Sequence, residues 1–248
     1  MVRTLPSLQH LALRTQSLGM HPGGFPIGIT TICPHLRHPE IWGAALGDLP
    51  PELGRLTGLT HLDLGCARTT SLPDSASRLS ALQERNHASS SELSLPPGLT
   101  ACRQLSQLLV ERCPLPAVLT RLQSLRCLGF KAEADQLPDA CCWNQLMGLM
   151  ELRLLCWHGM PAMLGDFAGL QTLIITGARL DNLPAGPYLS RLESLEMAYC
   201  TVLDDFPASL AAAAQLRNLD IDHERAVSCV SLNAADMALL GSLPVLEP

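Results

Sequence analysis

Residues 49–64, LPPELGRLTGLTHLDL, contain one full copy of the pattern that decides the fold. Its leucines at 59, 62 and 64 give the spacing L-x-x-L-x-L, and this spacing, with Leu, Ile, Val, Met or Phe at the last position, recurs along the whole chain. The copies start at residues 8, 36, 59, 82, 105, 125, 149, 170, 192 and 216, those at 36 and 82 being weaker. A repeat of about 23 residues predicts a stacked solenoid.

Leucine-proline pairs give the phase of the repeat independently. When the first leucine of each copy is counted as position 1, four such pairs occupy positions 14 and 15: Leu49-Pro50, Leu72-Pro73, Leu95-Pro96 and Leu183-Pro184. Proline cannot donate a hydrogen bond to a sheet, so these pairs should lie where the chain leaves the strand and crosses the outer side. We therefore expect the leucine of each pair to point back into the core.

The spacing and the leucine-proline pairs together resemble the leucine-rich repeat family over roughly residues 5–246. Residues 49–64 look most like the intracellular plant and algal type, related to Ras-group and disease-resistance repeats. The resemblance implies an α/β fold: a horseshoe-shaped leucine-rich repeat solenoid with a parallel concave β-sheet and short helices or turns on the convex side. It implies one domain, residues 1–248, of about ten repeats.

Three parts of the chain depart from the pattern. Family members usually carry Asn or Cys at position 9, whereas here only Cys113 and Cys200 match and no Asn occurs, so we expect an irregular ladder. Residues 19–35 are rich in Gly and Pro and indicate a protruding or irregular loop. In the fourth copy Arg85 and His87 occupy core positions, and because burying an unpaired charge is costly, this repeat should be distorted.

The outer segments and the two ends give further expectations. Alanine has the highest helix propensity, so the alanine-rich residues 211–214 are the best helix candidate. Neither end shows a polar cap, which indicates a fragment of a longer array or a stack that continues in a partner. The alternative is a degenerate cap formed by residues 1–7 and 225–248.

Composition narrows the function classes. The net charge of −6 argues against general nucleic-acid binding. The chain contains no run of 18 apolar residues, so we predict no membrane-spanning helix. The chain has no separate apolar leader, no N-x-S/T sequon and no C-x-x-C pair, so we predict a cytoplasmic protein whose ten cysteines are mostly buried structural thiols. A redox or metal role for the adjacent pair Cys141-Cys142 is the alternative.

The binding surface should be the concave face. Positions 4 and 6 of each copy should point inward, and positions 3, 5, 7 and 8 outward. The outward residues include large apolar groups in the middle repeats, two aromatic residues, and carboxylates that make the C-terminal third acidic and suited to a basic partner. The candidate partner-binding residues are Trp42, Leu109, Leu155, Ile174, Glu196, Tyr199, Asp220 and Asp222.

Three histidines, His10, His38 and His61, share position 3 of the first three copies. On adjacent parallel strands they should stack as a column. Such a column has a geometry that could hold a metal, but we favour solvent-facing histidines that titrate together.

No catalytic motif is present, and no cofactor is predicted. The leading hypothesis is a non-catalytic module that binds a protein partner of unknown identity, as a scaffold or sensor in signalling or defence. Two alternatives remain open: a structural component of the cytoskeleton or axoneme, and the ligand-sensing part of a resistance-type receptor. The sequence alone does not decide among them, because fold does not fix function.

Overall fold

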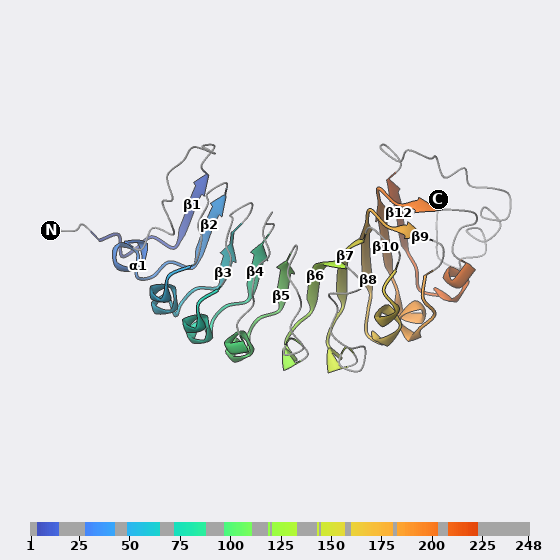
Figure 1. Ribbon diagram of the computed structural model, residues 1–248, viewed down its shortest axis with the longest axis horizontal. Helices are drawn as coiled ribbons and strands as arrows, with labels where there is room; N and C mark the ends of the chain where they lie inside the picture. The colour runs from blue at the N-terminus through green and yellow to red at the C-terminus, as the bar shows by residue number, and fades with distance from the viewer. Residues whose placement is uncertain are drawn as a thin grey trace. The chain divides into compact units, whose positions relative to one another are not determined.

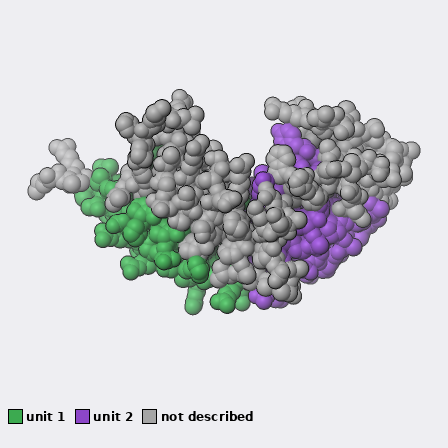
Figure 2. Space-filling view, in the orientation of Figure 1, with its two compact units in different colours: residues 1–125 green, residues 126–248 purple. Residues whose placement is uncertain are grey.

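The computed structural model describes residues 4–14, 28–42, 49–64, 72–87, 97–110, 119, 121–132, 143, 145–156, 160–180, 183–202 and 208–222. The chain divides into two compact units, residues 1–125 and 126–248, coloured separately in Figure 2. Within each unit, short parallel strands follow one another in sequence order, and segments with short helices connect them (Figure 1).

Among the described residues of unit 1, five strands pair in parallel with their neighbours in the chain. The strands are β1 (His10–Arg14), β2 (His38–Trp42), β3 (His61–Asp63), β4 (Glu84–His87) and β5 (Gln107–Val110). The helices are α1 (Ile29–Ile32) and the 3-10 helices η1 (Pro51–Arg55), η2 (Asp74–Arg78) and η3 (Pro97–Ala101).

Unit 2 repeats this arrangement and adds a second, two-stranded sheet. Its main strands are β6 (Cys127–Ala132), β7 (Glu151–Cys156), β8 (Thr172–Thr176), β10 (Ser194–Ala198) and β12 (Asn218–Asp222). The small sheet pairs β9 (Arg179–Leu180) with β11 (Thr201–Val202). Its 3-10 helices are η6 (Ala162–Asp166), η7 (Pro187–Arg191) and η8 (Ala208–Ala212).

The alternation of buried and half-buried residues along the strands confirms the predicted orientation. In β8, Leu173 and Ile175 are fully buried, while the residues on either side of each are half-buried. The leucine of the leucine-proline pair is also buried, as at Leu49 and Leu183. In η1 the extended backbone of Pro50 starts the 3-10 helix on the outer side. The fold is thus an α/β leucine-rich repeat solenoid, with a parallel sheet and short outer helices.

A shared carbonyl ties the start of a strand to the preceding repeat, as in β2 and β8. The Gln9 carbonyl accepts hydrogen bonds from the successive amides of Arg37 and His38, at 2.8 and 2.9 Å. The Met150 carbonyl accepts in the same way from Gln171 and Thr172, also at 2.8 and 2.9 Å. Because two successive amides bond to one carbonyl, these backbone contacts support the register of the neighbouring strands independently of their side chains.

Three predictions about irregular segments need correction. Part of the expected loop at 19–35 is the helix α1, and residues 19–27 lie outside the described part of the chain. The alanine-rich helix is a 3-10 helix that ends at Ala212, so it covers only the first half of 211–214. In the fourth repeat the strand itself is not distorted: β4 pairs in register with β3 and β5, and Arg85 takes the register position of Leu62 and Leu108. The side chains of Arg85 and His87, and residues 88–96, lie outside the described part of the chain.

Four cysteines are buried and free within the described ranges: Cys33, Cys102, Cys127 and Cys200. Cys200 occupies position 9, where its thiol lies 3.6 Å from the Ile175 carbonyl oxygen and 3.5 Å from that of Ala198. A weak thiol donor therefore takes the place of the usual asparagine there. Cys113 and the Cys141-Cys142 pair lie outside the described residues.

Candidate functional site

The side of the sheet on which positions 3, 5 and 7 of each repeat point outward is called here the exposed sheet face. In unit 2 its position-5 residues are aligned by strand register, with Arg153 opposite Ile174, Ile174 opposite Glu196, and Glu196 opposite Asp220. The structure therefore brings three of the predicted binding residues into one row across β8, β10 and β12. Asp222 lies at position 7 of β12, and its side chain is outside the described part of the chain.

The predicted apolar residues are less exposed than expected. Leu155 and Ile174 in unit 2, and Leu109 in unit 1, are half-buried rather than open to solvent. Ile174, for example, lies between Arg153 and Glu196 on the adjacent strands, and strands pair at a separation of about 4.8 Å. The aromatic residues are more accessible: Trp42, at the end of β2, is 38% exposed, and Tyr199, directly after β10, is 47% exposed.

The carboxylates on the exposed sheet face of unit 2 differ in exposure and in the strands that carry them. Glu196 is half-buried and Asp220 is exposed. The outward residues of β8, β10 and β12 include no lysine or arginine. On the neighbouring strand β7, by contrast, Arg153 donates from Nε to the Glu151 carboxylate. The acidic residues predicted for this part of the sheet therefore lie on β10 and β12, while the outward residues of β8 are uncharged.

In unit 1 the predicted histidine column is confirmed. The rings of His10 and His38 are 6.3 Å apart between centroids in an edge-on arrangement, and those of His38 and His61 are stacked at 4.2 Å. Parallel pairing of β1, β2 and β3 places the same repeat position side by side, which is why the column forms.

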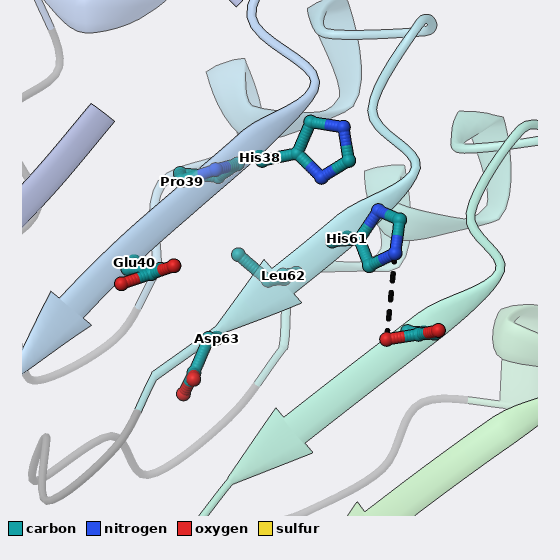
Figure 3. A pocket seen from close by; sticks show the side chains of 7 residues that line it. His38, Pro39, Glu40, His61, Leu62 and Asp63 are labelled. Carbon is teal, nitrogen blue, oxygen red and sulfur yellow. Dashed lines mark ion pairs between the residues drawn. The ribbon is translucent and has the colours of Figure 1, made fainter. Parts of the chain in front are cut away.

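Carboxylates from the neighbouring repeats surround this column, although the sequence interpretation did not single them out. His10 Nε2 lies 3.1 Å from Glu40, and His61 Nε2 lies 3.4 Å from Glu84, the contact dashed in Figure 3. A pocket of about 160 Å³ opens beside the stacked pair, lined by His38, Pro39, Glu40, His61, Leu62, Asp63 and Glu84 (Figure 3). The alignment of positions 3 and 5 in consecutive copies could have predicted this cluster.

The middle histidine has the most perturbed environment. Partial burial lowers the pKa of His38 from its ordinary value of 6.5, and the nearby imidazoles of His61 and His10 lower it further. Its Nε2 lies 3.4 Å from the Thr60 hydroxyl. At neutral pH the column is therefore uncharged at its centre.

The geometry of the column does not favour the metal site. His38 and His61 present ring faces to each other, with an interplanar angle of 29°, so their nitrogen lone pairs do not converge. Among the described residues, no group of three His, Cys, Asp or Glu side chains is arranged to hold a metal ion.

The buried thiols are poorly suited to nucleophilic chemistry. Burial raises the pKa of Cys102 to about 11 and, with the nearby Glu151 carboxylate, raises that of Cys127 to about 12. Both thiols are thus protonated at neutral pH, and a thiol attacks only as its thiolate.

Within the described ranges, no helix is long and apolar enough to cross a membrane.

Solved structures with the same fold support the assignment of the solenoid. They include a leucine-rich repeat protein of Leptospira interrogans (18% identity, TM-score 0.58), the plant peptide hormone receptor RGFR1 in complex with RGF2 (21%, 0.56) and TLR13 in complex with ssRNA13 (19%, 0.63). The alignments cover 90, 89 and 85% of this chain, which spans only 59, 37 and 32% of those proteins. No protein-family model and no curated protein sequence matches the chain.

Proposed function

We propose that this chain is a non-catalytic interaction module that binds a protein partner through its exposed sheet face. The observation that carries the proposal is the register of unit 2, which sets Ile174 beside Glu196 and Glu196 beside Asp220 on one face. A partly exposed apolar group next to carboxylates matches the composition of protein interfaces, where an apolar centre meets a polar rim. The proposed binding set of unit 2 also includes Leu155, Tyr199 and Asp222. On unit 1, considered by itself, we propose Trp42 and Leu109 as binding residues.

The partner is a protein with a basic surface. The outward residues of β8, β10 and β12 include acidic but no basic side chains, so a basic partner is attracted and correctly oriented on approach. RGFR1 has this fold and is in complex with RGF2, which supports a peptide or protein ligand. The TLR13 complex shows that the fold also accepts RNA, but acidic strands would repel a phosphate backbone.

The role and the compartment are also part of the proposal. Four buried free thiols are consistent with a reducing compartment, and we infer a cytoplasmic protein. Within it, the resemblance to intracellular plant and algal repeats supports a scaffold or sensor in signalling or defence.

The proposal can be tested by affinity capture with three forms of the chain. One bait is the native sequence and the second carries Glu196→Lys and Asp220→Lys. The third is a matched control with the same change in charge on the outer helices, Asp74→Lys and Asp166→Lys. A protein retained by the native and control baits but lost from the second, with all three folded by circular dichroism, supports the proposal. Equal capture by all three baits would move the binding surface elsewhere.

A further inference from the structure

Two consecutive repeats of unit 2 make the same left-handed corner at position 8. Gly177 follows β8 with φ 74°, and Tyr199 follows β10 with φ 55°. Tyr199 is the single non-glycine residue with positive φ in the described part of the chain. Glycine adopts this conformation freely, whereas the Cβ of a bulky residue meets the backbone there. One repeat therefore uses the expected residue at the corner and the next uses an unfavourable one.

The corner is fixed by the backbone on both of its sides. Before it, the Gly177 amide donates to the Ala198 carbonyl at 2.9 Å. After it, the chain enters the two-stranded sheet, in which Thr201 pairs with Arg179. The buried Cys200 thiol is anchored on the carbonyls of the preceding strands. These contacts are made by the backbone and by the Cys200 thiol, so they hold the corner without using the phenol ring.

The Tyr199 ring is also poorly placed to repay its backbone strain by packing. It is 47% exposed, in contrast to Tyr188, which is fully buried and donates from its hydroxyl to the Pro184 carbonyl at 2.8 Å. A strained residue with an accessible aromatic side chain indicates a role outside the fold, because such strain concentrates at functional sites. Exposed tyrosine is also a residue type enriched at binding hot spots.

The surroundings of Tyr199 point to the chemistry of the group it meets. Ala198, the last outward residue of β10, leads directly into Tyr199, and the same strand carries Glu196 beside Asp220. An arginine side chain suits both features, since its planar guanidinium stacks on an aromatic ring and forms paired hydrogen bonds with a carboxylate. Lysine has the same charge but lacks the planar fork.

We propose that Tyr199 anchors an arginine-bearing segment of the partner, stacking its ring on a guanidinium whose hydrogen bonds are accepted by the carboxylates of β10 and β12. This proposal rests on the interaction function proposed above and adds the anchoring residue and the recognised side chain. It explains why position 8 carries a tyrosine where the preceding repeat has a glycine.

The test uses two fluorescein-labelled peptides on the full chain, one of alternating arginine and glycine and one of alternating lysine and glycine. The native chain should bind the arginine peptide more tightly, by on the order of tenfold. Tyr199→Phe keeps the ring and should keep this preference. Tyr199→Gly should lose the preference while its urea unfolding midpoint stays or rises, because the strain is relieved. Glu196→Gln with Asp220→Asn should weaken binding of both peptides.

Three results would overturn the inference: equal binding of the two peptides by the native chain, a preference that survives Tyr199→Gly, or a lower unfolding midpoint in that variant. The last result would make the ring structural. If no arginine preference exists but capture of the partner still depends on Glu196 and Asp220, the interaction function stands and the anchor alone is wrong. An arginine preference without a partner captured on this face would instead contradict the proposed function.

Discussion

Truncation of Leu173 to alanine tests the repeat register most directly. Leu173 lies in β8 between Leu152 of β7 and Leu195 of β10, and all three side chains are fully buried. Because register fixes both neighbours, they cannot close over the space that the missing carbons leave. The change should therefore cost about 3–5 kcal/mol, in the upper part of the range for buried leucine. With a urea m-value of about 2 kcal/mol/M, the unfolding midpoint should fall by about 1.5–2.5 M.

The matched control is Ile174→Ala, one residue further along the same strand. Ile174 points to the exposed sheet face and is half-buried, so its truncation should cost about 1–2 kcal/mol, less than the cost at Leu173. Urea unfolding followed by far-ultraviolet circular dichroism measures both variants. Equal costs at the two positions would refute the alternation of inward and outward residues on which the fold and the site both depend.

Three further predictions concern other parts of the structure. By NMR titration the pKa of His38 should lie below 6.5 and should rise in a His61→Gln variant, which removes a repelling neighbour. Since the folded state then binds this proton less readily than the unfolded chain, the stability that neutral His38 contributes is full above pH 6.5 and is lost as pH falls below it. Gly186→Ala should lower the melting temperature, at a cost of about 1–3 kcal/mol, because its Cβ would lie 2.6 Å from backbone of the neighbouring outer turn, whereas Gly58→Ala, with open space around it, should be neutral. Cys127, buried and with a pKa of about 12, should resist Ellman's reagent at neutral pH until the chain unfolds, as peptide mapping would show.

Much of the fold could be predicted from the leucine spacing because that spacing states which side chains are buried. Leu62 and Leu108 lie inward as expected, and so does the leucine of each described leucine-proline pair. The same logic predicted distortion around Arg85, yet β4 keeps its register. Backbone hydrogen bonds on both edges of the strand hold it there, for instance from Glu84 N–H to the Thr60 carbonyl at 3.1 Å. Side-chain pattern alone does not contain that contribution.

The candidate site could be predicted only in part. Register follows from the repeat, so the histidine column and the row from Ile174 to Asp220 were accessible from sequence. The left-handed backbone of Tyr199 was not, because tyrosine gives no local indication of it. The partial burial of Leu155 likewise depends on side chains of adjacent strands, which the sequence of one repeat does not reveal.

The shared carbonyl also bears on how such a chain can change over evolutionary time. Arg37 and His38 reach the Gln9 carbonyl across an interval of 28 residues, whereas Gln171 and Thr172 reach that of Met150 across 21. The same anchoring bond thus closes on intervening segments of different length. Residues can be gained or lost between two strands while each strand still starts at its proper neighbour. A chain built this way can acquire new surface loops one at a time, without changes to the residues of its core.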